Sequence, residues 1–212
     1  ARGNVAGTTG VNKFGRNPIV AADSTEDIWD GSAVYVWPTT AVITHVSQTT
    51  DQAAMRGQTI EVMGLDANWD VVTQNAVLDA TDTTTIIALT TPLIRVFRKK
   101  VQANVVADSD IRAHDAGETQ DYSIITAGNN QTLMAIYTVP NGKTAYMEGY
   151  YANLNQTANV GPTACNVRLF ARDNDAGYER QVKHFLGLDP DATSHFNHQF
   201  RPYTKFTQKT DI

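Results

Sequence analysis

The sequence predicts an all-β protein with two sandwich- or jelly-roll-like subdomains behind an extended N-terminal arm. Three observations lead to this prediction. Short runs of β-branched and aromatic residues follow one another from residue 33 to the C-terminus. Clusters of Gly, Pro, Asn and Asp separate these runs, and no stretch between them has the apolar spacing of an amphipathic helix. Short strands in such a series are typical of a sandwich or a barrel.

Residues 1–31 are expected to form the arm. This segment is rich in Gly, Asn and Thr and shows neither a helical period nor strand alternation, yet it contains Phe14 and Trp29. We expect at most one helical turn, over 23–29, with Ser24 or Thr25 as its N-cap. An aperiodic segment cannot bury a face of its own. The arm therefore has to pack on a larger surface, which is either the body of its own chain or a neighbouring subunit.

The first subdomain is expected over residues 32–100. One of its runs, 59–65, alternates in polarity and so places Ile60 and Val62 on one face of a strand. The turn 66–70 and a further run follow it, which predicts a hairpin. The expected strands cover residues 33–37, 42–47, 59–65, 71–78, 83–89 and 93–98.

A linker or long loop is expected over 101–117, because this stretch is polar and irregular. The second subdomain then covers 118–212. Its turn at 140–143 begins with Pro and continues with Asn-Gly, residues that suit the central positions of tight turns. The expected strands cover residues 122–125, 132–139, 144–151, 165–171, 178–186, 194–200 and 203–206.

The composition argues against several classes of function. Of the 212 residues, 42% are hydrophobic and only 18% are charged, whereas about 25% charged residues are usual. Neutral polar residues take the place of the missing charges, which suits repeated protein contacts because few ions have to be desolvated. The net charge is -5 and the longest basic block is 98–100, so we expect no nucleic-acid binding. No apolar run has the length of a bilayer span, and we expect no membrane association.

Histidines near the C-terminus are the best candidates for a metal site. His184, His195 and His198 lie within the last thirty residues and could in principle bind zinc or iron. However, a spacing of three points His195 and His198 to opposite faces of a strand, and no carboxylate stands at a ligand spacing. We therefore expect no metal site. Cys165 is the only cysteine, so no intrachain disulfide forms, and we expect it to be a small buried apolar residue.

Acidic clusters and catalytic motifs give no better candidate. Asp173 with Asp175, and Asp108 with Asp110, offer oxygens to calcium, but the remaining ligands of a calcium loop are absent. We expect these residues to make hydrogen bonds within turns. The sequence has neither a nucleophile elbow nor a phosphate-binding glycine loop. The prediction is a protein without catalytic residues and without a cofactor.

Aromatic residues give a different signal. Tyr150 and Tyr151 belong to one expected strand, and Trp69 stands in the expected hairpin turn. A Trp at a turn tip either folds back over its own sheet or contacts a neighbouring subunit; the sequence favours the first. We take Trp69, Tyr150 and Tyr151 as candidate surface aromatics.

Several segments resemble one family of proteins. The sequence is similar to a widespread group of tailed-bacteriophage virion structural proteins, common in marine and freshwater phages. The matching segments occur in order along nearly the whole chain: ARG at 1–3, VNKFGRN at 11–17, EDIWDG at 26–31, EVMGLDANW at 61–69, NNQTLMAIYTVPNGKTAY at 129–146, NVRLFAR at 166–172 and KFTQKTDI at 205–212. The resemblance implies a role in the virion, which is assembled in the host cytoplasm, and implies no catalytic residues.

The first hypothesis is a capsid decoration or cement protein that binds the head lattice. Its partners would be the major capsid protein or another virion protein and further copies of the chain as a homo-oligomer. The arm would be the anchor, with Phe14, Arg16, Ile28 and Trp29 as interaction residues, since interface energy concentrates in a few large side chains. Alternatives are a tail, baseplate or fibre-adaptor component, a carbohydrate-binding β-sandwich module, and an enzyme that uses the histidines as its metal site.

Overall fold

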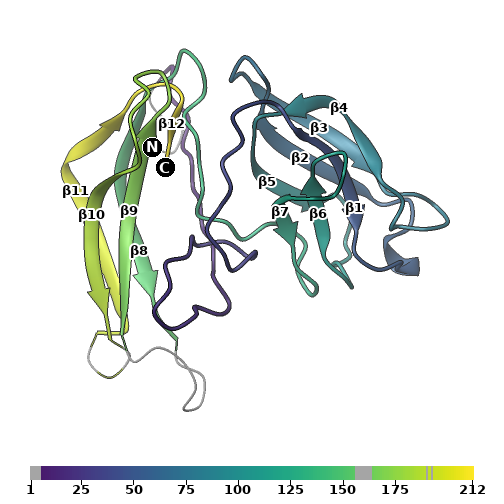
Figure 1. Ribbon diagram of the computed structural model, residues 1–212, viewed down its shortest axis with the longest axis horizontal. Helices are drawn as coiled ribbons and strands as arrows, with labels where there is room; N and C mark the ends of the chain where they lie inside the picture. The colour runs from purple at the N-terminus through teal and green to yellow at the C-terminus, as the bar shows by residue number, and fades with distance from the viewer. Residues whose placement is uncertain (1–5, 156–163, 190, 192) are drawn as a thin grey trace.

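A computed structural model describes residues 6–155, 164–189, 191 and 193–212 of the chain. The prediction of an all-β protein is confirmed. Twelve strands make up the described part, together with one short 3-10 helix, η1 (Ala53–Met55). Figure 1 shows two β lobes side by side, with the N-terminal arm running between them.

The N-terminal sandwich contains two antiparallel sheets. One sheet has the order β4 (Ile87–Leu93), β1 (Ile43–Gln48), β6 (Ile111–His114) and β7 (Asp121–Ile125). The other has the order β3 (Val71–Val77), β2 (Thr59–Leu65) and β5 (Arg95–Val101). The predicted hairpin is confirmed, because β2 and β3 pair from Thr59 opposite Val77 to Leu65 opposite Val71.

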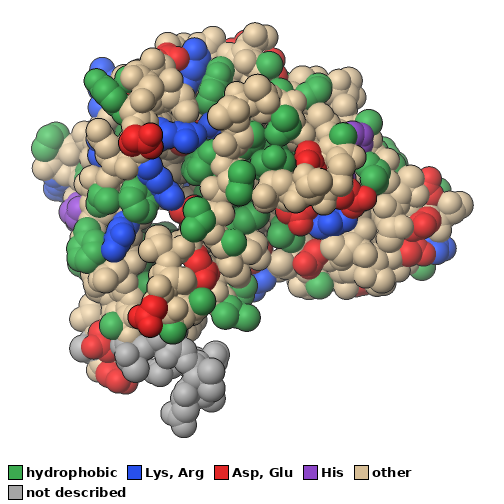
Figure 2. Space-filling model, in the orientation of Figure 1, with side chains coloured by type: hydrophobic (Ala, Val, Ile, Leu, Met, Phe, Trp, Pro, Cys, Tyr) green, Lys and Arg blue, Asp and Glu red, His purple; other side chains and the backbone are tan. Residues whose placement is uncertain are grey.

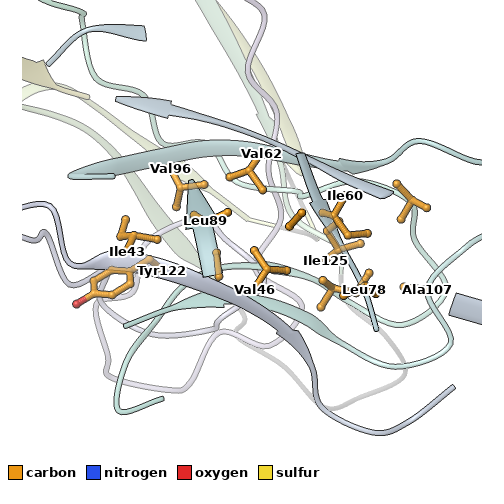
Figure 3. Close-up of a cluster of buried hydrophobic side chains, with 14 of the residues drawn as sticks. Ile43, Val46, Ile60, Val62, Leu78, Leu89, Val96, Ala107, Tyr122 and Ile125 are labelled. Atoms are coloured by element: carbon orange, nitrogen blue, oxygen red, sulfur yellow. The ribbon is translucent and has the colours of Figure 1, made fainter. Parts of the chain in front are cut away.

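Aliphatic side chains from both sheets fill the space between them (Figure 3). Ile60 and Val62 of β2 are fully buried and lie on one face, as the alternation predicts. They meet Val46 from β1 and Ile125 from β7 in the same cluster. Each such side chain contributes roughly 1.5–3 kcal/mol when it leaves water, so this core holds the lobe together without a disulfide.

The boundary between the lobes lies later than expected. The predicted linker over 101–117 is wrong, because it contains β6, which pairs with β1 on one side and β7 on the other. The predicted start of the second subdomain at 118 is therefore wrong as well. Strand β6 escapes sequence reasoning because it is short and contains Arg112 and His114. His114 is nevertheless buried, and its Nε2 lies 3.0 Å from Ser47 Oγ.

The C-terminal sandwich also has two antiparallel sheets. A two-stranded sheet pairs β8 (Ala145–Asn153) with β11 (His195–Phe206). The facing sheet has the order β10 (Gln181–Leu188), β9 (Cys165–Asp173) and β12 (Thr210–Asp211). Cys165 is partly buried, and burial raises the pKa of its thiol. The sheets pack through residues such as Ala171 and Phe206.

Residues 126–144 connect the lobes and are extended without forming a regular strand, so the strand predicted over 132–139 is wrong. This connecting segment instead makes single β-bridges to three partners in turn: Gln131 to β5, Met134 to the arm and Thr138 to β12. Its backbone N–H and C=O groups therefore bond to several different parts of the chain. The predicted turn at 140–143 is present, with the Lys143 amide donating to the Pro140 carbonyl at 3.2 Å.

A buried ion pair, the inter-lobe clamp, holds the two lobes and the arm together. Arg95 of β5 donates to both carboxylate oxygens of Asp211 in β12, at 2.8 and 2.9 Å, and both side chains are 3% exposed. Arg172 of β9 donates to the same carboxylate at 2.9 Å. The rings of Trp37 and Trp69 lie 5.1 and 4.8 Å from the Arg95 guanidinium carbon.

The position of Trp69 confirms that this residue folds back over its own sheet. Its backbone has a positive φ of 65°, which turns the ring onto Leu65, Ile94 and Phe97. The indole therefore shields the clamp from water and strengthens the attraction between Arg95 and Asp211.

Candidate functional site

The arm packs on its own chain. Trp29 is only 4% exposed, and its indole N–H donates to the Ala33 carbonyl at 2.9 Å. Its ring meets the edge of Tyr35 at 5.2 Å between centroids. The neighbouring Ile28 carbonyl accepts from the Ala135 amide at 2.8 Å. Trp29 and Tyr35 also share a buried cluster with Met134 and Ile136, so hydrophobic packing and the backbone bond fix this part of the arm to the connecting segment.

Further contacts hold the first part of the arm. A Cβ on Gly15 would overlap the backbone of Ala135 and Met134, so only glycine allows this close approach. Arg16 pairs with Asp30 at 2.7 Å. The Lys13 ammonium group donates to the Phe97 carbonyl. Burial, with a smaller effect of Arg98, lowers the pKa of Lys13 to about 7.

The arm is longer than predicted and contains no helix. The strand expected over 33–37 does not form, so the aperiodic segment continues to residue 41, and we use "the arm" for residues 6–41 from here on. The expected helical turn over 23–29 is absent, and Asp23 has a positive φ of 56°. Tyr35 and Trp37 point inward while Val34 and Val36 are exposed, the alternation of an extended chain.

The four predicted interaction residues of the arm differ in their exposure and in their contacts. Trp29 is buried in its own chain, so its assignment as an anchor for a neighbour is wrong. Phe14 is partly buried, Arg16 is tied to Asp30, and Ile28 is 37% exposed.

Other large aliphatic side chains of the arm are exposed in their place. Figure 2 shows hydrophobic side chains over the middle of the molecule, where the arm and the connecting segment run. The exposed fractions are 56% for Val11, 74% for Ile19, 56% for Val34 and 48% for Val36. Sequence reasoning chose the large aromatic residues Phe14 and Trp29, and the arm uses these two to pack on its own chain, Phe14 in part.

Two of the three histidines form a stacked pair. The rings of His184 and His198 stack inside the C-terminal sandwich, 4.0 Å apart, and the Tyr150 hydroxyl lies 2.6 Å from His184 Nδ1. His195 is exposed, on the opposite face from His198. Burial and the nearby His198 lower the pKa of His184. Within the described residues, no group of three His, Cys, Asp or Glu could hold a metal ion.

The predicted turn bonding of the acidic clusters is confirmed for Asp173, whereas Asp175 and Asp110 bond to more distant segments. Asp173 accepts from the Ala176 amide at 3.0 Å and from the Thr207 hydroxyl at 2.8 Å. Asp175 pairs with Lys209 at 2.8 Å, and Asp110 accepts from the Ala127 amide at 2.9 Å. These carboxylates are therefore used by donors of the protein itself.

One Ser–His pair was not foreseen. Ser47 and His114 lie side by side in β1 and β6, and both are fully buried. The other ring nitrogen of His114 bonds to the Asp115 carbonyl at 2.7 Å. Burial lowers the pKa of His114. No substrate reaches a serine buried in this way, so the pair stabilises the sheet.

An open groove lies on the outer face of the β8–β11 sheet. It has a volume of about 820 Å³ and is lined by Glu148, Gly149, Tyr150, Tyr151, Asn197, Gln199, Phe200, Arg201, Pro202 and Tyr203. Tyr151 lies opposite Asn197 and is 72% exposed; Tyr203 is 59% exposed. Arg201 donates to the Gln199 side chain at 3.2 Å.

A bulge in β11 builds one wall of this groove. The pairing register shifts between Gln199, which faces Gly149, and Thr204, which faces Met147. Four residues of β11, 200–203, therefore stand opposite the single residue Glu148 of β8, and they arch away from the ladder, as bulged residues do. Sequence reasoning missed Tyr203, because Pro202 marks a break between two expected strands.

The candidate aromatics therefore separate into two groups. Tyr151 is at the surface as predicted, and Tyr203 joins it. Trp69 belongs to the inter-lobe clamp, and Tyr150 turns its hydroxyl into the sandwich toward His184.

Comparisons of this chain with protein-family models, with curated proteins and with solved structures give no match. Across the described residues, no helix has both the length and the hydrophobicity needed to cross a membrane.

Proposed function

We propose that this protein is a non-enzymatic structural component of a tailed-bacteriophage virion that decorates the head lattice. The observation that carries the proposal is the arm, which is pinned to its own chain yet exposes Val11, Ile19, Val34 and Val36. The resemblance of the sequence to phage virion proteins supports the same role. The partner is the major capsid protein or another virion protein, with further copies of this chain beside it.

A pinned arm is a good docking surface for a physical reason. The contacts of Lys13, Gly15 and Trp29 fix the backbone before any partner arrives. A segment whose backbone is already ordered loses less conformational entropy on binding. Each aliphatic side chain buried against the lattice then contributes roughly 1.5–3 kcal/mol, and many copies on one shell add to the occupancy.

The test is binding to shells that lack this protein. Ile19→Asp and Val34→Asp place charges on the exposed side of the arm without touching the residues that pin it. We expect both variants to leave the shells unoccupied, because a carboxylate would have to be buried unpaired. Val71→Asp is the matched control, since Val71 of β3 is 54% exposed and lies outside the arm.

Occupancy is measured by densitometry of purified particles. Full occupancy by the arm variants would contradict the proposal. The same gels give the copy number, which distinguishes a location on the head from one on the tail. Hundreds of copies per particle agree with the head lattice, whereas the small number expected for a tail or baseplate ring would indicate a tail component.

A further inference from the structure

We propose that the groove on the outer face of β8 and β11 binds a neutral oligosaccharide chain. The groove combines two exposed aromatic rings, Tyr151 and Tyr203, with side chains that donate and accept hydrogen bonds. All of these residues come from β8 and β11: Tyr151, Asn197 and Gln199 stand in the paired ladder, and Tyr203 stands in the bulge of β11. The proposal does not require the arm to dock.

The two tyrosines match the chemistry of a sugar ring. A pyranose has an apolar face of C–H groups, which packs on an aromatic ring, and a rim of hydroxyl groups. Tyr is suited to such contacts because its ring is apolar and its hydroxyl is polar. Isolated exposed tyrosines are ordinary, but here both rings border one hollow.

The polar lining matches the hydroxyl rim. Asn197 and Gln199 carry planar amides that donate and accept, and Arg201 adds further donors. The hydrogen bond from Arg201 to Gln199 holds both side chains in place. Well-placed polar groups beside an aromatic lining are what gives a binding site its specificity.

Charge and shape favour a neutral chain over other ligands. Arg201 and Glu148 are the charged residues of the lining and have opposite signs, whereas a polyanion is bound by clustered cations. The hollow is open and about 820 Å³ in volume, within the usual range for ligand sites. A flat protein surface would leave such a hollow unfilled, because protein interfaces require close complementarity.

The groove points away from the arm. On the opposite sheet of this sandwich, Arg172 of β9 lies 5.7 Å from the Trp37 ring, and Arg180, directly before β10, pairs with Asp27, so that sheet faces the arm. The outer face of β8–β11 is the other side of the sandwich. A protein held through its arm therefore presents the groove to the surroundings.

Affinity gel electrophoresis of the full chain tests this proposal. The gels contain a soluble glucan, a mannan or a galactan as neutral polysaccharides, and alginate as an anionic one. We expect at least one neutral polysaccharide to retard the protein. Tyr151→Ala and Tyr203→Ala should each weaken that binding on the order of tenfold, equivalent to ~1.4 kcal/mol. Tyr178→Ala is the matched control, because Tyr178 is 60% exposed but lies outside the groove.

Three results would overturn the proposal: no retardation by any neutral polysaccharide, retardation by alginate alone, or equal weakening by Tyr178→Ala. Sedimentation of the wild type and of Tyr151→Asp tests for a fourth contradicting result. If the wild type is a dimer and the variant a monomer, a second copy of the chain fills the groove. Shell binding by Tyr151→Ala stays at the wild-type level in any of these cases, so failure of the sugar site is distinguishable from failure of arm docking.

Discussion

The two sandwiches share a layered architecture but differ in what fills them. In the N-terminal sandwich, aliphatic residues such as Val46, Ile60 and Ile111 are 0% exposed. The C-terminal sandwich has a smaller buried cluster around Ala171 and Phe206, and part of its interior is a stack of histidines and aromatic rings. We therefore expect the first lobe to supply most of the stability, while the second lobe exposes aromatic side chains on its outer face.

The largest expected effect comes from separating the lobes. Asp211→Ala leaves the buried guanidinium of Arg95 without its partner, and Arg172 loses the same carboxylate. Breaking a buried pair from one side costs about 3–5 kcal/mol. We expect a loss of this size in urea unfolding, and separate transitions for the two lobes in calorimetry. The double variant Arg95→Met with Asp211→Leu should recover part of the loss; a single unchanged transition in Asp211→Ala would contradict the role of the clamp.

A matched pair of core substitutions compares the lobes directly. Leu93 is fully buried in the N-terminal sandwich, and Leu169 is only partly buried in the C-terminal one. Leu93→Ala should cost about 2–5 kcal/mol, and Leu169→Ala about 1 kcal/mol. Urea unfolding of both variants measures the difference. Equal costs would show that the two cores are equally well packed.

The histidine stack should make the C-terminal sandwich sensitive to acid. The pKa of His184 in the folded protein lies below its ordinary value of 6.5. The unfolded chain therefore binds more protons, and folding stability falls as the pH drops below about 6.5. Urea unfolding at pH 8 and pH 5 should show this loss. His114 shifts in the same direction, so His184→Asn should remove only part of it, and His195→Asn, at an exposed position, none.

The smallest effect concerns the start of the arm. Because the pKa of Lys13 is lowered from 10.5 to about 7, the unfolded chain binds more protons between these values, and the packing of Lys13 becomes more favourable as the pH rises from about 7 toward 10. Hydrogen exchange of residues 11–17 should therefore show tighter packing at pH 9 than at pH 7, after correction for the intrinsic exchange rate. Lys13→Met should abolish this dependence; its persistence in the variant would assign it to another group.

Local patterns predicted the fold class but not the lobe boundary. Alternation at 59–65 and the following turn identify a hairpin because both are encoded by adjacent residues. Strand β6 is different: Arg112 and His114 interrupt its hydrophobic pattern, and only pairing with β1 makes it a strand. Contacts of this kind join residues far apart in the sequence, and polarity along the chain does not reveal them.

The functional surfaces were predicted only in part, for a related reason. The sequence identified the arm as a segment that needs a surface, and it identified Tyr151. It did not identify the partner of Trp29, because the bridge to Met134 spans more than one hundred residues. Tyr203 was missed because the bulge after Gln199 depends on the pairing with β8.

Hydrogen exchange of the protein bound to shells distinguishes docking through the arm from docking through the groove. We expect new protection within the arm, at 11–20 and 33–37, compared with the free protein. We expect unchanged exchange in β8 and β11 around the groove. Protection at 148–151 and 197–203 with none in the arm would contradict docking through the arm, because the groove and not the arm would then face the lattice.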